Sequence, residues 1–259
     1  PLTAEVQTAT RQYDASTLFE ASLSYSQTPD SNLLGTAVIN AGSKNVGTYD
    51  AQVSGLFSTQ QGYDIEYINN SQKLVITPKE LAVTIASKTK VYDGNADTTL
   101  IASDYTLEGT IDGESIAFEA PVGQTLGTYN SKNVAEATTV TASLGLNSFT
   151  LGQNTLLSNY VLPTTAIGVG VITPKTLTIN NVILDGKEYD GNANADVFVG
   201  VSTLDGLVGN ETLGVAATGV YDNVNAGFNR NVTVSYLLLD ESNAALASNY
   251  SLANTQHQA

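Results

Sequence analysis

The chain of 259 residues contains no cysteine, no methionine and no tryptophan, and its single histidine is His257. Without cysteine it can form no disulfide, and it has neither a thiolate nucleophile nor a thiolate ligand for zinc or an iron–sulfur cluster. A two-histidine metal site is impossible with one histidine, and a Ser-His-Asp triad would have to use His257, close to the end of the sequence. We therefore expect that the chain is not an enzyme and needs no cofactor.

Charged side chains are scarce and mostly negative. They make up 14% of the residues, and 25 Asp and Glu against 10 Lys and Arg leave a net charge of −15. Because binding to phosphates depends on Lys and Arg, this balance argues against nucleic acid as a partner. No long apolar run and no basic leader followed by an apolar stretch is present, so we expect no membrane insertion. The absence of methionine suggests a piece of a longer polypeptide.

Threonine, asparagine and glycine are abundant instead. Threonine is β-branched and suits a half-exposed pleated strand, while asparagine and the 22 glycines supply turns that require a positive φ. This composition predicts an all-β fold with little helix.

Three short motifs occur twice along the chain, in one order and at nearly one spacing. Val-Ile-Thr-Pro-Lys is followed each time by Tyr-Asp-Gly-Asn-Ala and then by Ser-Asn-Tyr. Their positions are 75–79 and 171–175, 92–96 and 189–193, and 158–160 and 248–250. Repetition at intervals of 90 to 97 residues predicts tandem modules of one fold.

The two Pro-Lys pairs mark the boundaries between modules. Only four residues separate Ile76 from Leu81, and Pro78 is one of them. Proline fixes its own φ at about −65° and holds the preceding residue extended, so the last strand of one module runs almost directly into the next. Tandem β-modules joined in this way predict an elongated, semi-rigid rod. The predicted modules are residues 1–79, 80–175 and 176–259.

The Tyr-Asp-Gly motif predicts a turn near the start of each module. Asp-Gly favours a tight type I′ hairpin, in which both central residues need a positive φ. The first module is diverged, because Tyr13-Asp14 lacks the following glycine, and the third lacks a closing Ile-Thr-Pro-Lys, so we expect its last strand to be truncated. The structural markers of the repeat are Tyr92, Asp93, Gly94, Tyr189, Asp190, Gly191, Pro78, Pro174, Tyr160 and Tyr250.

These motifs resemble the YDG repeat family, and the first module is similar to the MBG (mostly β-grasp) family. Both occur in large bacterial adhesins of the two-partner-secretion, filamentous-haemagglutinin-like kind. The third module carries the resemblance at Tyr189-Asp190-Gly191-Asn192 and in the segments 204–211, 221–227 and 248–250. The second follows the same order, with 107–114 in the central position.

The resemblance implies tandem β-grasp-like modules that form a structural stalk or spacer. Such a stalk extends a binding region for cell attachment, aggregation or biofilm, and it is secreted or lies on the bacterial cell surface. The implied partners are neighbouring repeats of the same polypeptide and, through the parent adhesin, a host or matrix glycan or protein.

Two other functions fit the same sequence. One is a β-module that binds a carbohydrate or protein directly, which binding of this chain alone to a glycan array would favour. The other is an accessory region of an enzyme, which a catalytic domain elsewhere in the parent gene would indicate. Paired glycosidase carboxylates need no sequence motif. The absence of tryptophan, however, removes the preferred surface for stacking sugars.

The Asp-Gly-Asn turns are candidates for calcium binding, although a turn without metal is the simpler interpretation. Carboxylate and amide oxygens suit calcium, but the EF-hand pattern is absent. The candidate ligands are Asp93, Asn95, Asp190 and Asn192. Acidic residues that include Glu114 and Glu211 are further candidates for binding calcium where modules meet.

Tyrosines recur at equivalent positions of the modules. Tyr13, Tyr92 and Tyr189 each precede an aspartate, and Tyr160 and Tyr250 end the Ser-Asn-Tyr motif. We expect these side chains to anchor the core, with each hydroxyl bonded to the backbone.

Overall fold

The structure is a computed structural model of the chain, and it describes residues 1–68, 70–119, 125–200, 203–241 and 245–259. Every regular element in these residues is a β-strand or a three-residue 3₁₀ helix, which confirms the predicted all-β fold. None of the helices found there has the length and apolar character needed to cross a membrane.

The chain divides into two compact units, and each is described by itself. Unit 1 comprises Pro1–Thr84, Tyr105–Pro121 and Leu144–Ala166; unit 2 comprises Ile85–Asp104, Val122–Ser143 and Ile167–Ala259. The second predicted module therefore contributes to both units. Two of its strands, β11 (Ala82–Val91) and β19 (Thr165–Thr173), have residues in each. The boundaries of the three modules stay a prediction.

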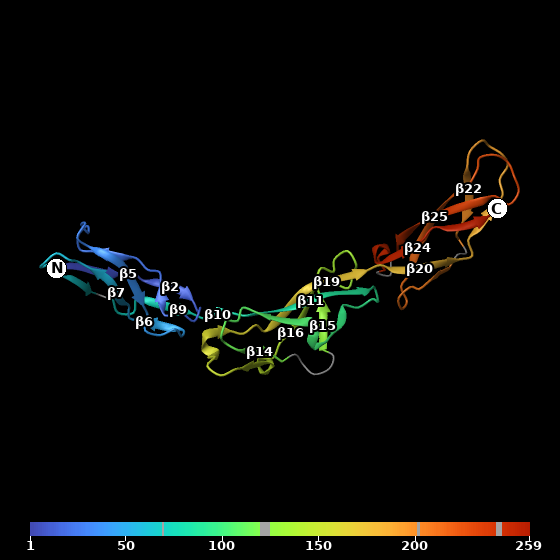
Figure 1. The fold of residues 1–259 in the computed structure, drawn as a ribbon. Coiled ribbons are helices and arrows are strands. Elements are labelled where there is room, and N and C mark those ends of the chain that lie inside the picture. Colours follow the sequence, from blue (N-terminus) through green and yellow to red (C-terminus); the bar gives the residue numbers. More distant parts are fainter. Residues whose placement is uncertain (69, 120–124, 201–202, 242–244) are drawn as a thin grey trace. The chain divides into compact units, whose positions relative to one another are not determined.

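Unit 1 is built from short strands in small sheets (Figure 1). Its strands are β1 (Leu2–Val6), β2 (Ala9–Gln12), β3 (Leu18–Phe19), β4 (Leu23–Tyr25), β5 (Leu34–Asn40), β6 (Gly47–Tyr49), β7 (Gln52–Phe57), β8 (Ile65–Ile68), β9 (Leu74–Thr77), β10 (Lys79–Glu80), β13 (Tyr105–Glu108), β14 (Ile116–Phe118), β17 (Phe149–Leu151) and β18 (Tyr160–Val161). The strand orders are β4-β1-β8, β2-β9-β6, β3-β5-β7, β10-β18 and β14-β17. Parallel pairing joins β1 to β8, β2 to β9 and β10 to β18. Two 3₁₀ helices, η2 (Leu146–Ser148) and η3 (Leu157–Asn159), complete the unit.

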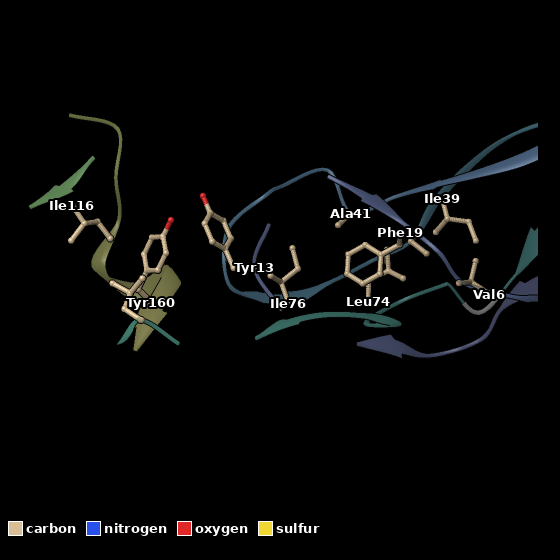
Figure 2. Close-up of a cluster of buried hydrophobic side chains, with 11 residues drawn as sticks. Val6, Tyr13, Phe19, Ile39, Ala41, Leu74, Ile76, Ile116 and Tyr160 are labelled. Atoms are coloured by element: carbon tan, nitrogen blue, oxygen red, sulfur yellow. The ribbon is translucent and has the colours of Figure 1, made fainter. Parts of the chain in front are cut away.

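One cluster of buried side chains forms the core of unit 1. It begins with alternate residues of the first module's strands, such as Val6 on β1 and Leu74 on β9, and it continues to Ile116 and Tyr160 of the second module. Figure 2 shows Tyr13 and Tyr160 facing each other within this cluster. Because burial of apolar surface is the main stabilising contribution to folding, the first module and the adjoining part of the second share one core.

Unit 2 contains the remaining strands. They are β12 (Asp97–Leu100), β15 (Thr125–Tyr129), β16 (Thr139–Ser143), β20 (Lys175–Asn180), β21 (Ile183–Asp185), β22 (Asn194–Phe198), β23 (Thr203–Asp205), β24 (Leu213–Tyr221), β25 (Asn231–Asp240), β26 (Tyr250–Leu252) and β27 (Thr255–Gln258). The strands pair in the orders β12-β15-β16, β23-β20-β26 and β21-β22-β24-β25-β27. Its 3₁₀ helices are η1 (Ala102–Asp104) and η4 (Ala247–Asn249). On β25 apolar side chains alternate with more exposed ones, and Val232 and Val234 are both fully buried.

The two marker prolines lie between consecutive strands. Pro78 is the single residue between β9 and β10 in unit 1, and Pro174 is the single residue between β19 and β20 in unit 2. A fixed φ at these positions turns the chain without a flexible linker.

The Tyr-Asp-Gly turns are not the predicted type I′ hairpins. Gly94 and Gly191 have φ values of +85° and +83°, but Asp93 and Asp190 keep a negative φ. Each aspartate instead accepts a hydrogen bond from the backbone N–H two residues on, at 3.1 and 3.0 Å. This is an Asx turn, in which the side chain replaces one backbone partner and a positive φ is needed at one residue only.

Candidate functional site

The first junction lies in unit 1, where a carboxylate of the second module meets tyrosines of two modules. The hydroxyl of Tyr13, which follows β2, donates to Glu114 Oε1, and the hydroxyl of Tyr160, at the start of β18, donates to Glu114 Oε2 at 2.7 Å. Lys44 Nζ lies 3.3 Å from Oε1. The Glu114 side chain is 4% exposed, so its charge is balanced by these donors rather than by water.

The second junction lies in unit 2 and repeats the glutamate between two tyrosines. The Tyr92 hydroxyl donates to Glu211 Oε1 at 2.8 Å, and the Tyr250 hydroxyl donates to Glu211 Oε2. The Tyr250 hydroxyl also accepts from the backbone N–H of Val208 at 3.0 Å. The carboxylate again joins a tyrosine that precedes an aspartate to a tyrosine that ends a Ser-Asn-Tyr motif.

The tyrosine rings pack edge to face at both junctions. The ring centroids of Tyr13 and Tyr160 are 5.5 Å apart, and those of Tyr92 and Tyr250 are 5.3 Å apart, with an interplanar angle of 76° in each pair. This arrangement places the positive edge of one ring on the negative face of the other and contributes about 0.5–1.5 kcal/mol beyond burial. All four side chains are at most 5% exposed.

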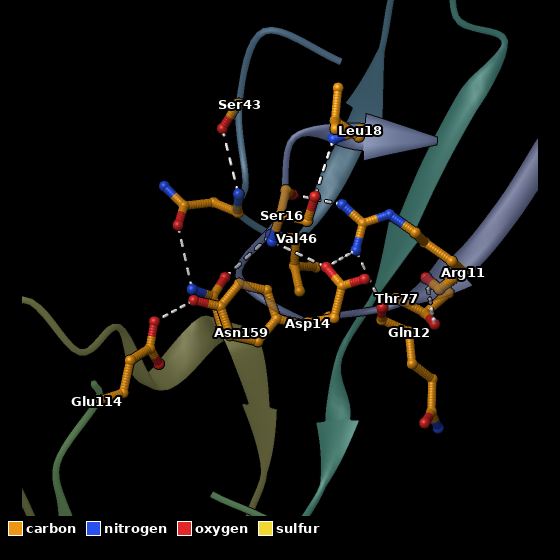
Figure 3. A network of polar contacts seen from close by, with 12 residues as sticks. Arg11, Gln12, Asp14, Ser16, Leu18, Ser43, Val46, Thr77, Glu114 and Asn159 are labelled. Atoms are coloured by element: carbon orange, nitrogen blue, oxygen red, sulfur yellow. Dashed lines mark hydrogen bonds and ion pairs between the residues drawn. The ribbon is translucent and has the colours of Figure 1, made fainter. Parts of the chain in front are cut away.

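A buried asparagine next to the tyrosine completes each junction. In unit 1, Asn159 Oδ1 accepts from the Val46 N–H at 2.9 Å, and its Nδ2 donates to Asn45 Oδ1 at 3.1 Å. Figure 3 shows Asn159 between Glu114 and the loop that carries Val46. The asparagine is 1% exposed, so both of its partners come from the protein.

The same bonds recur in unit 2. Asn249 Oδ1 accepts from the Val134 N–H at 2.9 Å, and its Nδ2 donates to Asn133 Oδ1 at 3.1 Å. Asn249 is fully buried. Equal distances at two places in the chain indicate one built interface that is used twice.

A short 3₁₀ helix positions the asparagine and the tyrosine at each junction. η3 ends at Asn159, and the Tyr160 N–H bonds back to the Leu157 carbonyl; η4 ends at Asn249 in the same way. The tyrosine then starts a strand that pairs in parallel with the strand after the marker proline, opposite Lys79 in one unit and Lys175 in the other. The Ser-Asn-Tyr motif is therefore held against the strand that follows the marker proline.

Burial and the shared carboxylates raise the pKa values of all four tyrosines. Burial and then the hydrogen bond to the glutamate raise the pKa of Tyr92 and of Tyr160 to about 12. The same causes raise the pKa of Tyr13 and of Tyr250. The hydroxyls are therefore protonated donors across the physiological range.

Opposing causes act on the carboxyl group of Glu114. Burial alone raises its pKa, but the hydrogen bonds from Tyr13, Tyr160 and Lys44 outweigh burial and hold the pKa below its ordinary value. Glu114 is therefore an ionised acceptor at neutral pH. An ionised carboxylate held by three donors binds and positions its neighbours.

The calcium candidates lie in turns that already contain a cation. Lys90 Nζ lies 2.7 Å from Asp93 Oδ1 and 3.0 Å from Asn95 Oδ1. Lys187 Nζ lies 2.8 Å from both Asp190 Oδ1 and Asn192 Oδ1. In the described part of the chain, no three His, Cys, Asp or Glu residues are grouped as metal ligands. Calcium binding at these turns stays a prediction, and it requires the lysine to leave.

The marker tyrosines agree only in part with the expected backbone-bonded core anchors. Tyr13, Tyr92, Tyr160 and Tyr250 are buried, and Tyr250 has the expected backbone partner. Each of the four hydroxyls, however, donates to a carboxylate of its junction. Tyr189 is not a core residue, since it is 66% exposed.

Sequence reasoning missed the role of the glutamates and asparagines. The sequence marks Glu114 and Glu211 as calcium candidates and as the ends of segments that resemble the YDG family, and Asn159 and Asn249 as parts of a repeated motif. A signal was available, because Glu114 and Glu211 are 97 residues apart, the same spacing as Tyr92 and Tyr189. That spacing marks the glutamate as part of the repeated unit.

The family model described as YDG domain matches residues 77–167 and 173–257. No curated protein and no solved structure matches the chain.

Proposed function

Because the chain belongs to the YDG domain family and carries two such domains in tandem, we propose that it is a structural stalk or spacer segment. The stalk belongs to a large secreted bacterial adhesin and extends a binding region for attachment, aggregation or biofilm. Its direct partners are neighbouring repeats, and the parent adhesin makes the contact with a host or matrix glycan or protein.

The observation that supports this proposal is the repeated junction. Two junctions, each with a glutamate between two buried tyrosines and a buried asparagine, join residues of successive modules. Hydrogen bonds to a charged group contribute about 1.5–3 kcal/mol each, and an unpaired buried charge costs more. A junction of this kind resists opening, which is what a spacer requires.

Small-angle scattering of the full chain tests the stalk. Three domains of about 35 Å placed end to end span on the order of 100 Å and have a radius of gyration of about 30 Å. One compact body of this length has a radius of gyration of about 18 Å. A measured value near the smaller figure overturns the proposal.

Spin labels in unit 1 test whether the junction is rigid. The chain has no cysteine, so the exposed Thr59 and Thr150 can be replaced by cysteine and labelled selectively. We expect a narrow distribution of distances between the labels, because the first module and the adjoining part of the second share a core. The combined substitution Glu114→Gln and Asn159→Ala should broaden it.

A matched control separates the junction from general effects of substitution. Glu108→Gln with Asn147→Ala changes the same residue types at exposed positions of the same unit. This control should leave the distribution narrow. Equally narrow distributions in both variants would show that the bonds of Glu114 and Asn159 do not hold the two modules in place.

A further inference from the structure

The third module has the same loops that form one side of each junction. At the two junctions, the tyrosine before the aspartate and an Asn-Val pair belong to one module, and the glutamate and the Asn-Tyr pair belong to the next. We call the first set the donor surface and the second set the acceptor surface. The donor surfaces described above are Tyr13 with Asn45 and Val46, and Tyr92 with Asn133 and Val134.

A shared turn identifies the donor surface of the third module. A side-chain oxygen of Ser43, Ser131 or Asn223 accepts from the backbone N–H two residues on, at 3.2, 3.1 and 2.8 Å. Those N–H groups belong to Asn45, Asn133 and Asn225. Asn225 and Ala226 therefore take the positions of the Asn-Val pair, and Tyr189 takes the position of Tyr13 and Tyr92.

This third donor surface has its tyrosine and its Asn-Ala pair, and it is uncovered. Tyr189 is 66% exposed, Val224 is 48% exposed, and Phe228 is fully exposed. The two loops surround a hollow of about 630 Å³ that these three residues help to line. The described residues offer no hydrogen-bond partner to the Tyr189 hydroxyl or to the Ala226 N–H, whereas their counterparts at both junctions are bonded.

We infer that the third donor surface docks a further YDG domain, which supplies a glutamate at the position of Glu211 and an Asn-Tyr pair at the position of 249–250. The glutamate accepts from the Tyr189 hydroxyl, and the asparagine accepts from the Ala226 N–H. Val224 and Phe228 are covered in the same step. The inference rests on the tandem-repeat part of the proposed function and not on the adhesin.

The first module of a second copy does not fit this surface equally well. In the first module the Leu33 N–H donates to the Asp30 carbonyl at 3.2 Å, and in the second the Glu114 N–H donates to the Ile111 carbonyl in the same way. Leu33 therefore occupies the position that the glutamate occupies on the acceptor surface. The Tyr63 N–H donates to the Gln60 carbonyl, as the Tyr160 N–H donates to the Leu157 carbonyl. Gly62 therefore occupies the position that the asparagine occupies on the acceptor surface. The first module therefore lacks both the carboxylate that would accept from the Tyr189 hydroxyl and the amide oxygen that would accept from the Ala226 N–H. This favours a YDG domain over head-to-tail pairing of two copies of this chain.

An extended chain tests the docking directly. Ala259 pairs with Arg230 through two backbone hydrogen bonds, and Gly170 bonds Thr138 at the corresponding place. Residues 171–259 appended after Ala259 therefore continue the chain in register and add one more YDG domain. The probe is nitration of Tyr189 by tetranitromethane, mapped by mass spectrometry, together with NMR exchange of the Ala226 amide.

We expect Tyr189 to be nitrated readily in the 259-residue chain and at least about tenfold more slowly in the extended chain. The Ala226 amide should gain at least about tenfold protection. Glu211→Ala with Asn249→Ala, made only in the appended copy, should restore both rates. Protected amides in the copies of Val232 and Val234 verify that the appended domain is folded in each chain.

Two results overturn the inference. One is an unchanged nitration rate of Tyr189 in an extended chain whose appended domain is folded. The other is protection of Tyr189 in the 259-residue chain as its concentration rises, which assigns the surface to a second copy. A radius of gyration near 18 Å for the 259-residue chain would overturn the stalk but not the docking of a further YDG domain, so the failure of one proposal can be distinguished from the failure of the other.

Discussion

The diverged first module has the same positive φ after its Tyr-Asp pair as the other two modules. Ala15 has a φ of +61°, and it holds the position that Gly94 and Gly191 hold with +85° and +83°. It follows Asp14, whose Oδ1 accepts from the Ser16 N–H at 2.9 Å. The missing glycine has therefore not changed the turn, and a side chain occupies a left-handed conformation that costs about 1–2 kcal/mol.

This strain predicts opposite effects of the same exchange in different modules. Ala15→Gly should raise the free energy of unfolding by up to about 1 kcal/mol, because the relief of backbone strain at Ala15 exceeds the entropy cost of the more flexible glycine in the unfolded chain. Gly191→Ala should lower it by about 1 kcal/mol, because no atom lies within 4 Å of the new Cβ and only φ is strained. Gly94→Ala should cost more, since its Cβ would lie 2.8 Å from Val208 Cγ1. Urea unfolding measures all three; a loss of stability in Ala15→Gly contradicts the argument.

The lysines at the same turns predict the response to calcium. Lys90 and Lys187 already neutralise Asp93 and Asp190, so millimolar calcium should leave the melting temperature equal to that measured with a chelator. The double substitution Lys90→Met and Lys187→Met removes the resident cation. Calcium should stabilise this variant only. A calcium-dependent melting temperature in the unsubstituted chain would show that the metal displaces lysine or binds elsewhere.

At the scale of the element, the short helices η3 and η4 place a buried asparagine against a loop of the preceding module. Asn159 and Asn249 each satisfy a donor and an acceptor that are distant in sequence. Asn159→Ala and Asn249→Ala should each lower the free energy of unfolding by about 2 kcal/mol or more, because they leave buried polar groups unpaired. Amide exchange should accelerate at Val46 in the first variant and at Val134 in the second.

The exposed asparagines Asn147 and Asn254 provide the controls for these substitutions. Replacing either by alanine should change stability by less than about 0.5 kcal/mol. Equal losses at the buried and exposed positions would mean that the junction bonds contribute nothing beyond the local chain.

The elements and the repeated markers could be predicted from the sequence, but the junctions could not. The repeated motifs and the prolines between strands are local signals, and both were informative. The bond from Tyr13 to Glu114 spans 101 residues, and the bond from Tyr92 to Glu211 spans 119. Periodicity within a module does not tell which loops of two modules meet, so the partner of each tyrosine required the structure. The type I′ prediction failed for a similar reason, because the Asx bond of Asp93 outweighed the dipeptide preference.

At the scale of the whole molecule, two carboxylates hold four tyrosine hydroxyls, and this coupling makes stability depend on pH. Below its ordinary pKa of about 4.5, Glu114 is protonated in the unfolded chain but still ionised in the folded one. Its contribution is therefore present above about pH 4.5 and is lost as the pH falls through the lower folded pKa. For the tyrosines the folded pKa is raised rather than lowered, so their contribution to stability is present at neutral pH and is lost as the pH rises.

We expect stability to fall between about pH 10 and 12. In this range the unfolded chain has lost tyrosine protons that the folded chain keeps, since the pKa of Tyr92 and of Tyr160 is raised to about 12. Unfolding then releases protons, so rising pH favours it, and each of these tyrosines accounts for about 2 kcal/mol across the range. Urea unfolding at successive pH values measures the slope. Tyr92→Phe removes one of the titrating groups and should reduce the slope, whereas Tyr189→Phe, outside both junctions, should leave it unchanged. An equal reduction by both substitutions would show that the alkaline loss does not come from the junctions.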